Sequence, residues 1–471
     1  MTIPRCVYVV HCIDTEGPLH EGLDASFERL RAIFGIDLKA DRETLRRLQA
    51  GEIDLGGLEG QVQQILSPHL IDYNDTWHKI DDMLDVMLSR NYRMQMPDVD
   101  GNGWIYSWFC VDHVDYLVNP RRRDIGYHNI FDHYRARLSN EASTRDALEF
   151  HYHPHPISGE AHRCATHWWA ESQTLHQILS RRVIERNWFP SANRPGFHVT
   201  RPDSHWFLEQ YLPFDYASQA VEPTQLDSSQ AGLDGGRFGD WRRAPLTWSP
   251  YHPSQDDYQI EGSCRRWIAR CLNVGTRYRL ISEEHVRQAF QEAAMGRPVV
   301  LSVTNHDFRD MRPDVDLMRR LIAKVSHDFP GIPFKYAGAV DAMRAALALQ
   351  PQPPCELNVS LQSNGGKGVV AEVTSITPTF GPQPWLALRT KSGRFHTDNF
   401  DIETPFHHWR YVFDDDTLPM DAIDRIGVAA NNAYGIATVK GIDPATGAIT
   451  ASHWNLPSEM PNLAAITEVT A

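Results

Sequence analysis

The sequence has few cysteines for its length, and they are not arranged in pairs. Its 471 residues include 7 cysteines, and no two of them form a Cys-x-x-Cys pair. An odd number without close spacing argues against a disulfide framework of the kind that small secreted proteins use. We therefore expect reduced thiols in a cytoplasmic protein.

Long hydrophobic runs are also missing. No apolar stretch approaches the roughly 20 residues that a membrane-spanning helix needs. The N-terminus leads from Met1 directly into a strand-like segment, without the basic region, apolar stretch and small-residue cleavage site of a signal peptide. We therefore expect no membrane span and no export signal.

Positive charge is in deficit. The chain has 46 Lys and Arg against 60 Asp and Glu, which gives a formal net charge of -14. This balance argues against nucleic acid or an anionic membrane surface as the main partner. The hydrophobic fraction of 42% is that of an ordinary globular protein with an ample core.

Histidines are concentrated in the stretch Phe150–Pro156, which carries His151, His153 and His155 at alternate positions. Side chains of a strand point to alternate faces, so all three imidazoles would lie on one side of a strand. Three uncompensated imidazoles on one face are costly unless they share a metal or a proton network. The pattern therefore indicates a metal site, with a solvated histidine-rich loop as the alternative.

An acidic pair follows the first predicted strand. Residues 6–13 form a short, β-branched apolar run typical of a buried strand, and Asp14 and Glu16 come directly after it. At strand spacing the two carboxylates share a face, where they are costly unless a cation or a proton lies between them. Active sites of α/β folds collect at this end of the strands, so we expect both acids in the site. The alternative is a pair of turn-forming acids in a surface loop.

Strands and helices alternate over residues 1–348, which predicts an α/β fold with a mostly parallel sheet or barrel. A helical insertion is expected at about residues 20–95, and a long loop over the site at 219–254. After a proline-rich joint at 350–354, short alternating runs predict an antiparallel β-sandwich domain over 355–471. The predicted strands of the first domain include 104–111, 147–152, 214–218, 298–304 and 333–336, and its later helices are 125–138, 174–186, 203–211, 282–294 and 315–325.

Polar groups also follow later strands. Arg194 lies in the segment 191–198, and His306 and Asp307 follow the strand at 298–304. An ordinary ion-pair partner and a core histidine are the alternatives for Arg194 and His306. The basic segment Asn119–Asp124 could contact an anionic substrate group, but we favour a solvated surface loop.

In this order on successive strands, these groups resemble the motifs of the polysaccharide deacetylase family, the NodB-homology domain of carbohydrate esterase family four. The family has an acidic pair on its first strand, a histidine pair on its third, an arginine beside proline or glycine, and a late histidine. The likeness covers roughly residues 5–340. The corresponding segments here are His11–Gly17, Glu149–His155, Asn193–Gly196 and Asn305–Phe308.

The resemblance implies an irregular (β/α) barrel of the polysaccharide deacetylase type and a set of roles. One carboxylate and two imidazoles would bind Zn²⁺ or another divalent transition metal, and the second carboxylate would take a proton from water. Arg194 would orient that carboxylate, and His306 would protonate the leaving amine. We assign catalysis to Asp14, His306 and Arg194, and metal binding to Glu16, His153, His155 and His151.

Two departures from the family pattern leave parts of this assignment open. The family's two acids are adjacent, whereas one residue separates them here, so which of them binds the metal is open. The family's histidines are four positions apart, which suits His151 and His155, but aligning Glu149 with the family's lead-in residue places His153 first. We favour His153 and His155, with His151 close behind.

We expect a metal-dependent deacetylase that acts on an N-acetylated sugar or a related amide, such as an intracellular precursor of a surface glycan or a secondary metabolite. One alternative is a glycosidase on the same barrel, which would need two carboxylates about 5 to 10 Å apart. Another is a non-catalytic carbohydrate-binding protein. The substrate would be a small molecule or a glycan, and a homo-oligomer is possible. Aromatic and histidine side chains of the β-sandwich either bind sugar or pack on the barrel, and we favour packing or oligomerisation. They are Trp385, His407, His408 and Trp409.

Overall fold

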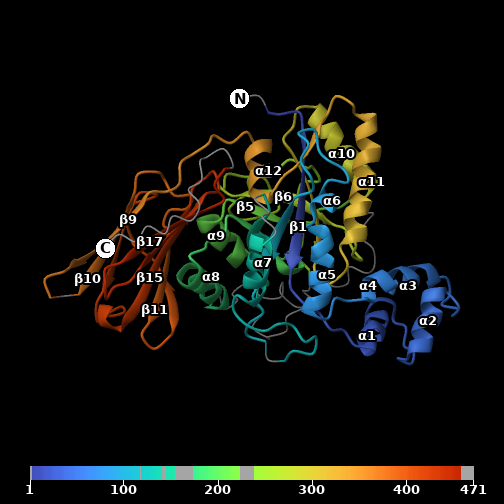
Figure 1. The fold of residues 1–471 in the computed structure, drawn as a ribbon, viewed down its shortest axis with the longest axis horizontal. Helices are drawn as coiled ribbons and strands as arrows, with labels where there is room; N and C mark the ends of the chain where they lie inside the picture. Colours follow the sequence, from blue (N-terminus) through green and yellow to red (C-terminus); the bar gives the residue numbers. More distant parts are fainter. Residues whose placement is uncertain are drawn as a thin grey trace.

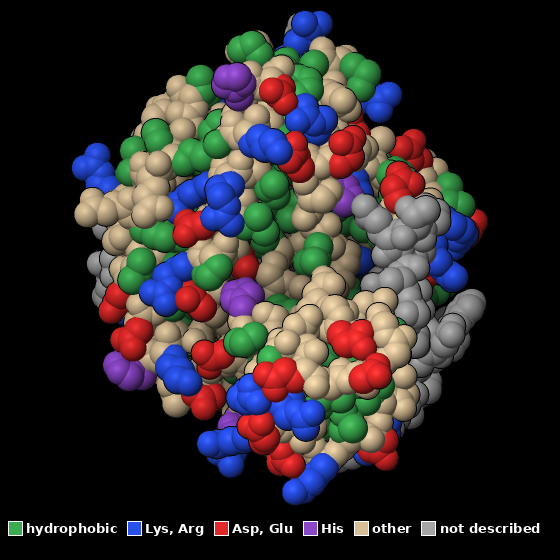
Figure 2. Space-filling view, turned by 90° about the vertical axis from the view of Figure 1, so that its right-hand side faces the viewer, with side chains coloured by type: hydrophobic (Ala, Val, Ile, Leu, Met, Phe, Trp, Pro, Cys, Tyr) green, Lys and Arg blue, Asp and Glu red, His purple; other side chains and the backbone are tan. Residues whose placement is uncertain are grey.

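The structure is a computed structural model that describes residues 3–116, 118–140, 145–154, 173–222, 238–366 and 368–457. Figure 1 shows a central barrel, with the small helices of the N-terminal insertion on one side and the C-terminal sheets on the other. His155 and the middle of the predicted loop at 219–254 lie outside the described residues. Acidic and basic side chains are interspersed over the face in Figure 2, so the net negative charge is not gathered there in one patch.

The barrel consists of parallel strands, each paired with the next one along the chain, and β7 pairs with β1 to close it. A further strand, β8 (Phe334–Tyr336), pairs with the first residues of β1, and β2 takes over at His11. The closed arrangement confirms the predicted α/β barrel. Its strands are β1 (Val7–Thr15), β2 (Tyr106–Cys110), β3 (Ala147–Tyr152), β4 (Ala192–Pro195), β5 (Phe214–Ser218), β6 (Trp267–Asn273) and β7 (Val299–His306).

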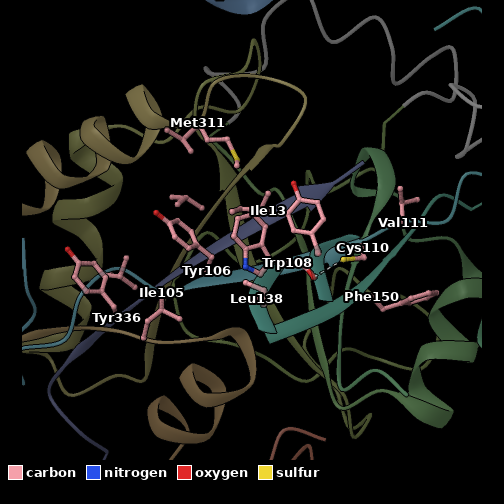
Figure 3. Packing of buried hydrophobic residues seen from close by; sticks show 14 of the residues in the cluster. Ile13, Ile105, Tyr106, Trp108, Cys110, Val111, Leu138, Phe150, Met311 and Tyr336 are labelled. Atoms are coloured by element: carbon pink, nitrogen blue, oxygen red, sulfur yellow. Dashed lines mark hydrogen bonds between the residues drawn. The ribbon is translucent and has the colours of Figure 1, made fainter. Parts of the chain in front are cut away.

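Alternate side chains of β1 belong to two different cores. Val7 and Ile13 pack in the cluster between the strands and the outer helices, whereas Tyr8 and Val10 belong to the cluster inside the barrel. Figure 3 shows part of the outer cluster, which includes Ile13 together with aromatic side chains of β2. Asp14 continues the inward series because strand side chains alternate with a period of two, so its carboxylate lies at the barrel mouth.

The chain between β1 and β2 forms the helical insertion, as predicted. Its first helices bury a small core around Phe27, Leu30 and Leu48. Asp41 caps one of them by accepting a hydrogen bond from the backbone N–H of Thr44. The helices are α1 (Leu23–Phe34), α2 (Arg42–Ala50), α3 (Glu59–Ile65), α4 (Pro68–Ile71), α5 (Trp77–Met87) and α6 (Arg90–Arg93).

The later helices follow the barrel strands, and the five that were predicted are all present. Ser282 caps the fourth of these, as expected, by accepting a hydrogen bond from the backbone N–H of His285. Within the described ranges, no helix combines the length and the apolar character that crossing a membrane requires. The helices are α7 (Asn129–Asn140), α8 (Gln173–Arg186), α9 (Pro202–Tyr211), α10 (Glu283–Ala294), α11 (Arg312–Asp328) and α12 (Ala339–Ala346), of which α12 was not predicted.

The C-terminal part forms two antiparallel sheets that share a hydrophobic core, as predicted. One sheet has the strand order β13-β14-β10-β9 and the other has the order β12-β11-β15-β16-β17. The strands are β9 (Leu357–Ser363), β10 (Val369–Ser375), β11 (Trp385–Thr390), β12 (Phe395–Asp398), β13 (Asp401–Thr404), β14 (His408–Phe413), β15 (Ile423–Asn431), β16 (Ala437–Ile442) and β17 (Ile449–Trp454).

The five-stranded sheet packs on the barrel through its second face. Trp385 and Ala387 of β11 belong to the same hydrophobic cluster as Val183 of α8 and Tyr211 of α9. Trp385 and Trp409 are 2% and 0% exposed, so neither presents a ring on which a sugar could stack. The structure thus favours packing over sugar binding for these tryptophans.

Candidate metal centre

The polar groups that follow the strands gather at one mouth of the barrel. All strands of a parallel barrel end on the same side, so the residues at their carboxyl ends meet there. In the sheet register Asp14 of β1 lies opposite His306 of β7, and His151 of β3 lies opposite Arg194 of β4. The fold therefore brings residues from distant parts of the sequence into one site.

Glu16, His151 and His153 form a cluster that could hold a metal ion. Nε2 of His151 lies 3.2 Å from Nε2 of His153. Oε1 of Glu16 lies 3.8 Å from Nε2 of His151 and 3.7 Å from Nε2 of His153. Two imidazole nitrogens and one carboxylate oxygen are the donors of many catalytic zinc sites, and they suit other divalent transition metals as well.

A hydrogen bond on its other nitrogen fixes the ring of His151. Nδ1 donates to the carbonyl oxygen of Arg194 at 2.6 Å, so the proton of the neutral imidazole resides on Nδ1. The lone pair of Nε2 then faces Glu16 and His153, as a metal ligand requires. Burial and the neighbouring His153 hold the pKa of His151 well below its usual value, so the ring is neutral near pH 7.

Neighbouring groups orient Glu16 through its side chain and its backbone. Oε2 lies 2.5 Å from Nη2 of Arg123, which leaves Oε1 on the side of the imidazoles. The backbone N–H donates to Oδ1 of Asp307 at 2.9 Å, and the backbone carbonyl accepts from Nε2 of His113 at 2.8 Å. Burial alone would raise the pKa of Glu16, but Arg123 and His153 hold it well below its usual value, so the carboxylate is ionised.

Asp14 has different partners. Its Oδ1 lies 2.8 Å from Nε of Arg194, and its Oδ2 lies 3.4 Å from Nε2 of His306. Burial raises the pKa of Asp14 to about 7, with Arg194 acting in the opposite direction. A carboxyl group with a pKa near 7 can take up and release a proton at neutral pH, which is what a general base needs.

Arg194 is fully buried, and two hydrogen bonds hold it in addition to its ion pair with Asp14. Nε donates to Oγ1 of Thr304 at 2.8 Å, and Nη1 donates to Nδ1 of His198 at 2.8 Å. The backbone φ angles of Phe197 and His198 are 52° and 54°, in a left-handed region that these residue types rarely adopt. Backbone strain of this kind concentrates at functional sites.

The cluster opens into a cavity of about 560 Å³, a volume typical of small-molecule sites. The helical insertion contributes Arg29 and Tyr73 to its wall. His113 and Arg123 come from the connection after β2, and Phe308 follows β7. The insertion therefore shapes the site as well as extending the fold.

The structure brings together all of the predicted site residues that it describes. The histidine that we ranked last, His151, lies in the cluster with Glu16 and His153. His155 is outside the described residues, so its role stays a prediction. Of the two acids, Glu16 is the one that lies near the Nε2 atoms of both His151 and His153. Asp14 lies near Arg194 and His306, and it approaches His151 only on the side of Nδ1, at 3.6 Å.

Sequence analysis missed several residues of the site. His198 is the last residue of the segment 191–198, and the spacing of residues along the chain does not indicate its hydrogen bond with Arg194. His113 contacts the backbone of Glu16 rather than its side chain. The solvated-loop interpretation of residues 119–124 holds for Arg121, which is exposed at the edge of the cavity, but was wrong for Arg123, which is largely buried against Glu16.

The fold and the site define a class of protein. It is a parallel α/β barrel whose mouth carries three side chains that could hold a metal ion and, beside them, a carboxylate paired with an arginine. No protein-family model, curated protein or solved structure matches the chain. The class therefore rests on the fold and on the geometry of the site.

Proposed function

We propose that the protein is a metal-dependent deacetylase that removes an acetyl or related acyl group from an N-acetylated sugar or a related amide. The observation that carries the proposal is the different surroundings of two acids, because Glu16 faces two imidazoles whereas Asp14 is held by Arg194. These surroundings support a metal-binding role for Glu16 and a proton-transfer role for Asp14. Metal-dependent amide hydrolysis needs both functions.

The proposed ion is Zn²⁺ or another divalent transition metal. Glu16 would hold it through Oε1, and His151 and His153 through their Nε2 atoms. When bound, such an ion polarises the amide carbonyl and lowers the pKa of water. The residues fit the ion, because Glu16 is ionised and His151 is neutral near pH 7, so protons compete little for these ligands.

Asp14 would take the proton of the water that attacks the amide carbon. Arg194 holds Oδ1 of Asp14, and Oδ2 faces Nε2 of His306. Burial lowers the pKa of His306 to about 3, so this imidazole is neutral at the start and would not hold a proton stably. Once the new C–O bond has formed, His306 would relay the proton from Asp14 to the leaving nitrogen in a single step, drawn by the basicity that this nitrogen gains as the C–N bond breaks.

Metal content and acetate release test this proposal together. The purified protein should contain about one divalent ion per chain and should release acetate from N-acetylated sugars. His153→Ala should lose most of the metal and of the activity, because a ligand is removed. His327→Ala changes a histidine of α11 whose side chain is 91% exposed, and it should leave both quantities unchanged.

The other outcomes each point to a different function. Bound metal without acetate release would replace deacetylation by hydrolysis of another amide or of a glycosidic bond. A protein that binds sugars but no metal would be a carbohydrate-binding protein, and the deacetylase proposal would be abandoned.

A further inference from the structure

Two arginines, Arg277 and Arg309, lie in the wall of the cavity. Arg277 lies between β6 and α10, and Arg309 lies one turn after β7, where its N–H donates to the carbonyl of His306 at 3.3 Å. Both side chains line the cavity of the metal centre. Among the residues that the structure describes, no carboxylate forms an ion pair with either of them.

Backbone carbonyl groups of the helical insertion hold both side chains in place. Nε of Arg277 donates to the carbonyl of Ile65 at 3.1 Å, and Nη2 donates to that of Leu70 at 3.0 Å. Nε of Arg309 donates to the same Leu70 carbonyl at 3.2 Å, and its guanidinium lies over the ring of Tyr73. Neutral partners of this kind fix the position of a guanidinium without cancelling its charge.

The neighbouring charges do not balance these two cations. Arg29 and Arg121 also line the cavity and share one carboxylate, Glu21, at 2.7 and 3.5 Å. The two acids of the metal centre are already paired with other arginines. Burial and the neighbouring Arg29 lower the pKa of Arg277 to about 10, so its charge lies in surroundings that solvate it poorly.

We propose that the substrate carries an anionic group, a carboxylate or a phosphate, that binds to Arg277 and Arg309. A partly buried cation without a counter-ion is unfavourable, and the planar guanidinium fork matches the oxygens of both groups. That the reacting amide lies in the same cavity rests on the proposed deacetylase function. The binding of the anion itself does not depend on that function.

Sugars without an acyl amide test anion binding separately from catalysis. Glucose, glucose 1-phosphate and glucuronic acid share a ring and differ in charge. Isothermal titration calorimetry on the purified full-length protein should show at least about tenfold tighter binding of one anionic sugar than of glucose. The tighter of the two anionic sugars identifies phosphate or carboxylate as the group that is recognised.

Arg277→Gln and Arg309→Gln should each reduce this preference by about tenfold, because a charged donor is replaced by a neutral one. Arg320→Gln, which changes an exposed arginine of α11, should preserve the preference. Arg277→Lys and Arg309→Lys keep the charge and should retain part of the preference, which separates loss of charge from loss of folded structure.

Equal affinities for the three sugars would overturn the proposal, as would a preference that survives in both glutamine variants. In the second case the anion would be bound elsewhere, for example at the metal. Failure to release acetate would instead overturn the deacetylase function and leave this proposal standing.

Discussion

At the scale of single residues, Asp14 and Glu16 differ in acidity although they lie two positions apart. Burial acts on both carboxyl groups in the same direction. Arg123 and His153 more than offset it at Glu16, whereas at Asp14 the opposing effect of Arg194 is only partial. The two side chains leave the chain on the same face, so their difference comes from partners that other strands and loops supply.

This difference predicts the pH dependence of the proposed hydrolysis. Burial raises the pKa of Asp14 to about 7, and a general base works only when it is deprotonated. We expect kcat/KM to fall tenfold per pH unit on the acidic side, with a midpoint at or below pH 7. A cation bound at Glu16 favours the ionised form of Asp14 and therefore shifts the midpoint to lower pH.

Asp14→Asn provides the matching control for this pH profile. The variant should lose about 100-fold or more in kcat and should retain its metal, because Glu16, His151 and His153 are unchanged. Metal content at each pH shows whether the acidic limb reflects loss of the ion. The same acidic limb in Asp14→Asn would exclude Asp14 as the base.

At the scale of elements, the segment after β4 packs directly against the histidine that follows β3. A Cβ atom at Gly196 would lie 2.5 Å from Cγ and Cδ2 of His153. Gly196→Ala should therefore displace the His153 ring and weaken metal binding by about 10- to 100-fold without removing a ligand. Competition for the metal with a fluorescent chelator measures this change in affinity.

Gly331→Ala is the control for this substitution, because a Cβ at Gly331 would have no atom within 4 Å. Its metal affinity should equal that of the unaltered protein. If Gly196→Ala bound metal equally well, His153 would not be a required ligand in its present position.

The elements that carry the site were predictable where side chains follow a simple period. The strand at 147–152 was predicted with the bounds that the structure shows. By contrast, β6 was missed because Arg270 interrupts its apolar pattern. The structure buries this arginine, whose guanidinium donates to the carbonyl groups of Ala220 and Leu246. These hydrogen bonds stabilise the buried charge, but they come from distant loops, so a local window of sequence gives no indication of them.

The contacts of the site residues with distant segments were likewise not predictable from the sequence. Spacing along the chain was enough to indicate Asp14 and Glu16, because both follow one strand. Nothing in the spacing shows that Arg123 lies against Glu16, or that Arg277 lines the cavity. These contacts depend on how long connections fold over the barrel mouth, and connections have no periodic pattern.

At the scale of the whole molecule, the barrel and the C-terminal sheets are joined by a common core. Successive residues of β11 alternate between the two sides, with Leu386 and Leu388 in the core of the sandwich and Trp385 and Ala387 in the cluster that extends into the barrel. Each side covers apolar surface that the other would expose to water. The two parts should therefore unfold together, in one cooperative transition.

Asn431 offers a way to test this coupling. The side chain is 2% exposed, and its Nδ2 donates to the carbonyl groups of Pro190 at 2.7 Å and Tyr211 at 3.0 Å. Its Oδ1 accepts from the hydroxyl of Ser191 at 2.8 Å. Asn431→Ala leaves these buried groups of the barrel without their partner, so we expect a loss of about 2–4 kcal/mol in the free energy of unfolding.

Calorimetry and urea unfolding show whether the barrel and the C-terminal sheets unfold in one transition. Asn431→Ala should shift the whole transition to lower temperature, whereas Asn358→Ala, at an exposed position of β9, should leave it in place. Two separate transitions, of which only one moves, would mean that the sheets are an independent appendage. Because Asn431 contacts residues 190 and 191, directly before the strand that carries Arg194, the C-terminal sheets support the start of that strand.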